Sequence, residues 1–259
     1  MKEKLALITG ATSGIGKSFA KKFASLGYNL IIIGRREPLI KKVAKELEYT
    51  YSVKVCTIIS NLSNTNEIDA LVEKIKHNNI DVLINNAGFG TYDFFYNESL
   101  EKLLNMINLH VVCTTKLTYA ILPGMLERNE GIIINVSSES AYLISPKSSV
   151  YSGTKAFVKL FTESLSLDLK NYNIKVQTLC PSFTKTDFHE KLGISKSEQI
   201  NKGLIRWEEP EAVVEKSMKY LDKNRTVCLC GGIISKLLIE LEHILPQKTY
   251  YNFVYKMFK

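Results

Sequence analysis

The chain lacks the paired cysteines that would form a disulfide framework or a zinc site. Its five cysteines are odd in number and include no Cys-x-x-Cys spacing: Cys56, Cys113, Cys180, Cys228 and Cys230. Cys228 and Cys230 fall in an expected strand, with both side chains on one face. The four histidines show no spacing of metal ligands. We therefore expect no bound metal.

The chain also lacks an apolar stretch of membrane-spanning length and a signal peptide, since its first residues lead directly into an expected strand. No dense basic run with interleaved aromatic residues occurs. The formal net charge of +8 comes mostly from lysines spread along helices, so the sequence does not favour nucleic-acid binding. Internal repeats and low-complexity linkers are absent. These absences predict one cytoplasmic domain over residues 1–259, with no transmembrane segment.

A strand, a glycine loop and a helix open the chain. Residues 5–9 form an apolar run typical of a buried strand, and residues 17–26 carry apolar side chains at helical spacing. Between them the glycines allow a tight turn, and the helix N-terminus offers free N–H groups to a pyrophosphate. The alternative is an ordinary strand-to-helix turn. The loop predicts dinucleotide binding by Gly10, Thr12, Ser13, Gly14, Ile15 and Gly16.

The second expected strand, residues 29–33, ends in Gly34-Arg35-Arg36. An acidic residue at this place would hold the ribose 2′-hydroxyl of NAD, whereas arginine forms charge-assisted bonds to a 2′-phosphate. Arg35 and Arg36 therefore predict NADP(H). The alternative is that they only open a solvated helix, although arginine in a first turn opposes the helix dipole.

Strands and helices alternate through the rest of the chain, which predicts a single doubly wound, Rossmann-type α/β domain. Its parallel sheet would have about seven strands, with helices on both faces. The further expected strands are 53–59, 81–84, 131–136, 174–179 and 226–229. The expected helices are 65–77, 99–125 with a break near Pro123, 149–171 and 210–221.

Tyr151 lies four residues before Lys155, with Ser137 and Ser138 upstream. Residues at i and i+4 share one face of a helix. A phenol, an ammonium group and a hydroxyl can move a proton in carbonyl reduction without a metal. Together with a dinucleotide site they predict hydride transfer. For the tyrosine and lysine taken alone, packing plus a solvated lysine is the alternative.

From about residue 4 to about residue 232 the chain resembles the short-chain dehydrogenase/reductase family of the Tyr-x-x-x-Lys type. The resemblance rests on motifs in the family's order. They are Thr9-Gly10-Ala11-Thr12-Ser13-Gly14-Ile15-Gly16, Asn85-Asn86-Ala87-Gly88, Asn108, Ser138, Tyr151-Ser152-Gly153-Thr154-Lys155 and Pro181-Ser182-Phe183-Thr184-Lys185-Thr186. Asn61, Ser182 and Glu139 depart from the family's usual aspartate, glycine and small neutral residue.

The resemblance implies a role for each catalytic residue. Tyr151 would donate the proton in reduction, and Ser138 would bond the carbonyl oxygen. Lys155 would bond the nicotinamide ribose and, with the charge of the oxidised nicotinamide, lower the pKa of Tyr151. Asn108 would hold a water that relays protons to Lys155. The remaining expected cofactor contacts are Asn61, Leu62, Asn86, Ala87, Gly88, Tyr151, Lys155, Pro181, Thr184 and Thr186.

Residues 182–207 predict a mobile lid with an apolar inner face above the carboxyl ends of the strands. Phe89, Tyr92, Phe94, Phe95 and Tyr96 could line the same cleft or simply pack. An apolar cleft favours a lipid-like carbonyl or alcohol, such as a 3-oxoacyl chain, a steroid or a hydrophobic aldehyde.

The tail, residues 233–259, carries an apolar stripe at helical spacing. The stripe favours packing on its own domain, with a subunit contact or a weak peripheral contact with a membrane surface as alternatives. A similar tail occurs in a bacterial branch of the family and in relatives of very-long-chain 3-ketoacyl reductases. The resemblance also suggests a homodimer or homotetramer through helices 99–125 and 149–171. The stripe consists of Leu237, Leu238, Leu241, Ile244 and Leu245.

Three functions remain open. The leading one is an NADP(H)-dependent oxidoreductase that interconverts a ketone or aldehyde and an alcohol on an apolar substrate. A narrower one is a 3-oxoacyl reductase of fatty-acid metabolism, which the long lid and tail disfavour. The third is a non-catalytic NADP(H)-binding regulator, against which the proton-transfer residues argue.

Overall fold

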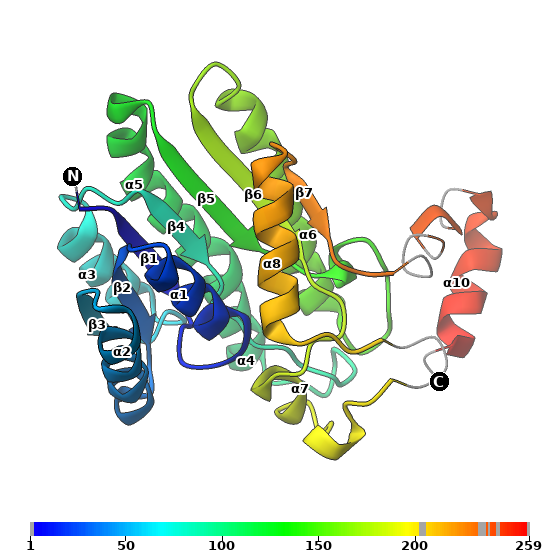
Figure 1. Ribbon diagram of the computed structural model, residues 1–259. Helices are drawn as coiled ribbons and strands as arrows, with labels where there is room; N and C mark the ends of the chain where they lie inside the picture. Colours follow the sequence, from blue (N-terminus) through cyan, green and yellow to red (C-terminus); the bar gives the residue numbers. More distant parts are fainter. Residues whose placement is uncertain (1–2, 202–205, 233–236, 238, 242–243, 258–259) are drawn as a thin grey trace.

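A computed structural model of the chain has a seven-stranded sheet between two layers of helices (Figure 1). It describes residues 3–201, 206–232, 237, 239–241 and 244–257. All strands run parallel in the order β3-β2-β1-β4-β5-β6-β7. This confirms the expected doubly wound sheet. The strands are β1 (Leu5–Thr9), β2 (Asn29–Gly34), β3 (Val55–Ile59), β4 (Val82–Asn85), β5 (Gly131–Val136), β6 (Ile174–Cys180) and β7 (Val227–Leu229).

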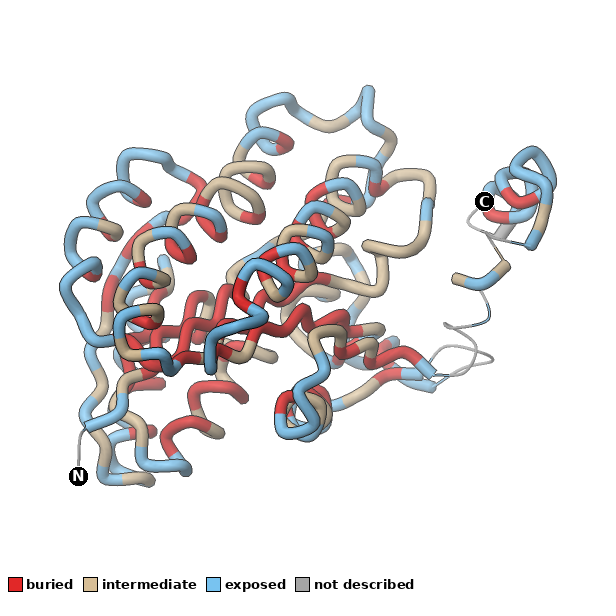
Figure 2. Tube along the Cα trace, turned by 90° about the horizontal axis from the view of Figure 1, so that it is seen from above, coloured by how far each residue is buried: buried red, intermediate tan, exposed pale blue. Residues whose placement is uncertain are grey.

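Both faces of the sheet are covered, as its near-continuous apolar strands require. In β1, Ala6 and Ile8 face a core formed with one helical layer, whereas Leu7 faces a core formed with the other. Figure 2 shows the buried sheet between these layers. The first layer contains α1 (Gly14–Ser25), α2 (Glu37–Tyr51) and α8 (Pro210–Asp222). The second contains α3 (Thr65–Ile75), α5 (Cys113–Arg128) and α6 (Ser149–Asp168), and α4 (Leu100–Ile107) packs against α6.

The strand order reverses direction between β1 and β4. From β1 the chain moves outward through β2 and β3, then returns to β4 on the other side of β1 and moves outward again. In open parallel sheets such a switch point opens a crevice at the carboxyl ends of the strands. The glycine loop follows β1 at this edge, and residues 86–88 follow β4.

The long helical region continues past Pro123, which differs from the expected break there. Pro123 lies inside α5. Its missing N–H would have paired with the carbonyl of Tyr119, and because Tyr119 is 82% exposed that carbonyl lies on the solvent side. The irregularity falls earlier, at the π-helical turn Asn108–Val112 between α4 and α5.

Because that turn keeps the region helical, the stretch Leu100–Arg128 is long and apolar enough to cross a membrane by length and composition, with a mean hydropathy of 1.2. This differs from the expectation that no apolar stretch reaches that length. Leu117, Ile121 and Met125 of this stretch are buried in the core beneath the sheet. Their burial is that of a core helix.

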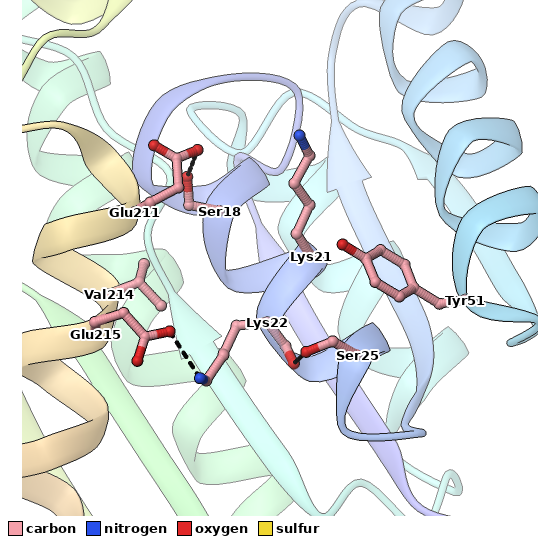
Figure 3. Close-up of a pocket in the computed structure, with 8 residues that line it drawn as sticks. All are labelled: Ser18, Lys21, Lys22, Ser25, Tyr51, Glu211, Val214 and Glu215. Atoms are coloured by element: carbon pink, nitrogen blue, oxygen red, sulfur yellow. Dashed lines mark hydrogen bonds and ion pairs between the residues drawn. The ribbon is translucent and has the colours of Figure 1, made fainter.

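A shallow groove of about 240 Å³ lies where α1 packs beside α8 (Figure 3). Two pairs of its polar side chains join the two helices. Ser18 donates to Glu211 over 3.0 Å, and Lys22 forms an ion pair of 2.7 Å with Glu215. These contacts fix the helix that follows the glycine loop, on the outer side of its layer.

The tail ends in α10 (Gln247–Met257), which lies beyond β7 and apart from both helical layers in the two views (Figures 1 and 2). Tyr250 and Val254 are buried, whereas Leu237 and Ile244 of the stripe are exposed. Leu238 lies outside the described residues. The own-domain packing that the stripe favours therefore stays a prediction.

Candidate active site

The glycine loop is shaped by positions that tolerate no side chain. Gly10 and Gly14 have φ angles of 68° and 55°, in the region that favours glycine. A Cβ on Gly16 would lie 2.4 Å from the Gly10 carbonyl oxygen. The loop therefore turns tightly onto the N-terminus of α1, where among the described residues the Ser13 side chain makes no capping bond. Such a cradle fits a dinucleotide pyrophosphate.

Residues after β4 are tied directly to this loop. The Thr9 hydroxyl oxygen accepts from the backbone N–H groups of Asn86 and Ala87, both over 2.9 Å. The Asn86 amide donates in turn to the Thr9 carbonyl over 2.9 Å. A Cβ on Gly10 would lie 2.8 Å from the Ala87 Cα. The two segments expected to border the cofactor thus form one wall.

Arg36 lies across the mouth of the glycine loop. Its Nη2 donates to the Thr12 hydroxyl over 3.0 Å and forms an ion pair of 3.9 Å with Asp187 of the lid. Arg35, beside it, is exposed. Both guanidinium groups lie where β2 ends, the place at which a dinucleotide ribose is recognised in sheets of this kind.

The proton-transfer residues converge where β5 meets α6. Ser138 follows β5, and its hydroxyl interacts with the Tyr151 phenol in the sense that lowers the pKa of that phenol. The same hydroxyl accepts from the Ser140 N–H over 3.1 Å. Lys155 Nζ lies 5.8 Å from the centroid of the Tyr151 ring and donates to the Val136 carbonyl over 2.9 Å. Ser137 is not part of this group; its hydroxyl donates to the Lys155 carbonyl and so fixes α6 on the strand end.

Burial determines the protonation states of the Tyr151 phenol and the Lys155 ammonium group. It raises the pKa of Tyr151 to about 12, and the Ser138 hydroxyl opposes that rise. Burial also lowers the pKa of Lys155 from 10.5 to about 8, against the effect of nearby Cys180. The protein alone therefore holds a neutral phenol rather than the easily ionised one that the resemblance implies with oxidised nicotinamide bound.

Four further expected residues, Asn108, Asn61, Leu62 and Gly88, lie in the segments that follow β3 and β4 and in the turn that follows α4. The Asn108 amide donates to the Ser63 carbonyl over 3.2 Å, and among the described residues no donor bonds its Oδ1 atom. The Asn61 Oδ1 accepts from the Ser63 N–H over 3.2 Å, and Leu62 between them is buried. Gly88 lies beside Lys155, whose Nζ would be 3.6 Å from a Cβ at that glycine.

The first residues of the lid, which follow β6, pack against the glycine loop. After β6 the Pro181 carbonyl accepts from the Glu139 N–H over 2.9 Å, and Thr184 is buried. A Cβ on Gly14 would meet the Thr186 methyl at 2.8 Å. Pro181, Thr184 and Thr186 therefore run from the catalytic serine segment to the pyrophosphate cradle.

The short helix α7 (Asp187–Glu190) closes over the catalytic tyrosine. The Phe188 ring packs 5.7 Å from that of Tyr151, and its Cζ would touch a Cβ on Gly90 at 2.8 Å. Further along, Trp207 packs on Phe183 and His189 at centroid distances of 5.2 and 4.7 Å. Leu204 and Ile205, also expected in the lid, lie outside the described residues.

The aromatic residues after Gly90 are mostly at the surface. Tyr92, Phe95 and Tyr96 are exposed, while Phe94 stacks on Tyr96 at 5.4 Å. Lys147 lies over Tyr92 and Phe94. Phe89, just before Gly90, is half-buried and lies 6.1 Å from His110.

Among the described residues no group of three or more His, Cys, Asp or Glu side chains gathers as a metal site would need. The Cys228 and Cys230 sulfurs lie 4.0 Å apart and are buried, on one face as expected.

Residues 4–196 match the family model described as short chain dehydrogenase. The chain belongs to the short-chain dehydrogenase/reductase family. It is 32% identical over 256 residues to the very-long-chain 3-oxoacyl-CoA reductase of Rattus norvegicus, a match that covers 95% of this chain and 77% of that protein. This relative is eukaryotic, so the bacterial branch expected from the tail stays a prediction.

Solved structures of short-chain dehydrogenases share the fold. A short-chain dehydrogenase from Sphingobium yanoikuyae in complex with NADPH has a TM-score of 0.84 and 26% identity, covering 93% of each chain. A family member from Burkholderia phymatum in complex with NAD has a TM-score of 0.81 and 24% identity, covering 94% of each chain. The chain is thus an oxidoreductase of a family that binds nicotinamide cofactors.

Three residues at this site have no sequence motif. Asp187 reaches Arg36 across 151 positions of the chain, and Phe188 reaches Tyr151 through the lid; only the fold brings them together. His110 is buried beside Tyr151 at 5.9 Å, although its sequence context suggests only a satisfied side chain. A histidine two residues after Asn108, in an otherwise apolar run, is the one available signal.

Proposed function

We propose that the protein reduces a ketone or aldehyde on an apolar substrate with NADPH, and oxidises the alcohol in reverse. One observation carries this proposal. The Tyr151 phenol, close to Ser138 and next to Lys155, packs against the apolar Phe188 of the lid. A proton donor under an apolar cover suits a carbonyl group on a hydrophobic molecule.

The bound cofactor would supply a hydride to the carbonyl carbon. The Ser138 hydroxyl would donate to the carbonyl oxygen and hold it in line with Tyr151. The Tyr151 Oη–H bond then breaks and its proton passes to that oxygen, giving the alcohol. A tyrosine with a pKa of about 12 is protonated at neutral pH, as a donor must be.

Lys155 would stabilise the phenolate that remains. With a pKa of about 8 it keeps its positive charge at neutral pH. The proposed relay from Asn108 would use its Oδ1 atom, because its amide group is bonded to Ser63.

The preference for NADPH is part of the proposal. Arg36 already donates to Thr12 at the rim of the glycine loop, and Arg35 is exposed beside it. Two guanidinium groups at the end of β2 would bind a 2′-phosphate through charge-assisted bonds, whereas a carboxylate would be needed to hold the 2′-hydroxyl of NADH.

A narrower substrate class is supported by the likeness to the rat reductase. That protein is named for very-long-chain 3-oxoacyl-CoA, and its match covers 95% of this chain. We therefore place 3-oxoacyl thioesters with long acyl chains first among the apolar substrates to test.

The test is oxidation of NADPH and NADH with 3-oxoacyl thioesters of several chain lengths, ketosteroids, diketones and aldehydes. We expect turnover with NADPH that is lost in Tyr151→Phe, which keeps the ring and removes the proton. Turnover that persists in Tyr151→Phe would refute the assigned proton donor, and faster turnover with NADH would refute the role of the arginines.

A further inference from the structure

His110 occupies a buried position at the centre of the π-helical turn Asn108–Val112. The wider turn of a π-helix shifts the residues after it on the helix surface, and such turns recur at functional sites. Here the turn separates α4 from α5. It presents the imidazole to α6 on one side and to the segment after β4 on the other, with 2% of His110 exposed.

Both ring nitrogens of His110 are bonded. Nδ1 lies 2.9 Å from the Thr154 hydroxyl oxygen, and Nε2 lies 3.3 Å from the Phe89 backbone nitrogen. The Thr154 hydroxyl donates its single proton to the Tyr151 carbonyl over 2.8 Å. Its oxygen must therefore accept from Nδ1. Nε2 must accept from the Phe89 N–H. These bonds fix a neutral imidazole with its proton on Nδ1.

The ring is also in van der Waals contact with both segments. Its Nε2 would lie 2.9 Å from a Cβ on Gly88, and its edge packs against the Tyr151 ring at 5.9 Å. Gly88 belongs to the wall that is tied to the glycine loop. Tyr151 and Thr154 belong to the first turns of α6. His110 thus connects the cofactor wall to the helix that carries the proton donor.

We propose that His110 is a positioning residue that sets the distance between the cofactor-side backbone at Gly88 and Phe89 and the phenol of Tyr151. This inference rests on the proposed carbonyl reduction. Hydride and proton reach adjacent atoms of one carbonyl group, so the two sources must be held in one geometry. An error of about 1 Å in such a geometry can reduce the rate by about 100-fold.

The surroundings keep the His110 imidazole in its neutral form. Burial, and then the ammonium group of Lys155, hold the pKa of His110 well below its usual range. The titratable groups that face the ring are Lys155 and Tyr151, both on α6. A protonated imidazole would have no acceptor for the Phe89 N–H, so the bond to the cofactor wall would be lost.

Two substitutions separate the two bonds. In His110→Asn the amide nitrogen replaces Nδ1 and can still donate to Thr154, but the side chain does not reach Phe89. In His110→Gln the amide oxygen replaces Nε2 and can still accept from Phe89, but the donor to Thr154 is lost. His110→Leu removes both bonds at similar volume.

The first measurement is hydrogen–deuterium exchange, which needs no substrate. We expect faster exchange around residues 88–90 in His110→Asn, around residues 151–155 in His110→Gln, and in both segments in His110→Leu. Gln177→Leu is the matched control, since it removes a buried pair with Ser217 near β7 and α8. It should leave both segments unchanged. Equal exchange in wild type and His110→Leu would overturn the connection.

The second measurement is single-turnover reduction with bound NADPH. We expect His110→Leu to lower this rate about 10- to 100-fold, with less than about a threefold change in NADPH dissociation constant measured by fluorescence. Partial recovery is expected in the Asn and Gln variants. A rate loss no greater than in Gln177→Leu would show that His110 only stabilises the fold. If wild type reduces no carbonyl, the proposed function is wrong. The exchange measurement then still shows whether His110 joins residues 88–90 to residues 151–155.

Discussion

Lys155 and Tyr151 show how burial acts on single residues with opposite consequences. Burial disfavours the charged form, so it raises the pKa of the phenol to about 12 and lowers that of the ammonium to about 8. At neutral pH the phenol is therefore held in its stable form, whereas the ammonium is held at a cost. The site retains a buried charge that weakens the fold.

That cost predicts a pH dependence of stability. Above pH about 8 the folded state releases the Lys155 proton, while the unfolded chain keeps it until about 10.5. The unfolded state then binds more protons, so wild type gains stability as pH rises through this window. Lys155→Met lacks this gain. We expect the free energy of unfolding of wild type to rise, relative to that of Lys155→Met, by about 3 kcal/mol between pH about 7 and about 10.5. Most of this rise should be complete by pH about 9.5.

Urea denaturation of both proteins at the two ends of this range measures the effect. Lys155→Met also leaves the Val136 carbonyl without its donor, which shifts the gap equally at every pH and does not affect its slope. Lys159→Met, one turn further along α6 and half-buried, is the matched control. A gap that stays constant with pH would contradict the lowered pKa of Lys155.

Arg36 and Asp187 predict how the cofactor is chosen. Arg36→Gln can keep a bond to Thr12 but loses its charge, so NADPH affinity should fall roughly 10- to 100-fold with little change for NADH. Asp187→Asn removes the carboxylate 3.9 Å from Arg36 and should tighten NADPH binding several-fold. Fluorescence titration with both cofactors measures this. Equal weakening of NADPH and NADH in Arg36→Gln would refute a 2′-phosphate contact.

At the scale of elements, the lid shows what packing adds to the motif residues. Phe188 lies between Tyr151 and Gly90, so it covers the proton donor. Phe188→Ala should reduce the preference for long over short acyl chains in kcat/KM by about 10-fold, since a buried aromatic contact contributes about 1–2 kcal/mol. Phe95→Ala, exposed on the neighbouring segment, should leave the preference unchanged. The measurement compares kcat/KM for long-chain and short-chain 3-oxoacyl thioesters. A preference that is preserved in Phe188→Ala would show that the acyl chain does not bind against Phe188.

Elements were predictable where a local pattern determines them. The apolar runs of β1 and β5 are short, rich in isoleucine or leucine and bounded by turn residues, which favours buried strands. The glycines at 10, 14 and 16 require a tight turn. The π-helical turn at Asn108 was missed because its residues are ordinary helix formers, and what stabilises it is the fit of His110 between two distant segments. Pro123 suggested a break that solvent exposure makes unnecessary. Site residues that lie in motifs, Arg36 among them, were named from the sequence. Contacts that only the fold brings about, such as the ion pair of Arg36 with Asp187, were not.

At the scale of the whole molecule, α6 carries Tyr151 and Lys155 on its inner face and an apolar stripe on its outer face. Phe157, Leu160 and Leu167 are exposed along that stripe, and Phe157 stacks on Phe161. Among the described residues no atom lies within 4 Å of where a Cβ on Gly153 would be. Large exposed apolar side chains on a helix face mark a surface for binding another protein, and a glycine beside them allows the partner to approach closely. We propose that a second copy of the chain covers this face, as the family resemblance suggests.

This proposal predicts that Leu160→Glu dissociates the assembly. A two-fold contact uses the same surface on both subunits, so one substitution places two carboxylates in a single apolar interface. Burying unpaired charges there should weaken association by about 100-fold or more. Light scattering after size-exclusion chromatography measures the mass. Leu26→Glu, 52% exposed at the end of α1 in the opposite layer, is the control and should keep the wild-type mass. A wild-type protein that is already monomeric, or a Leu160→Glu variant that stays assembled, would show that this face of α6 is not the contact.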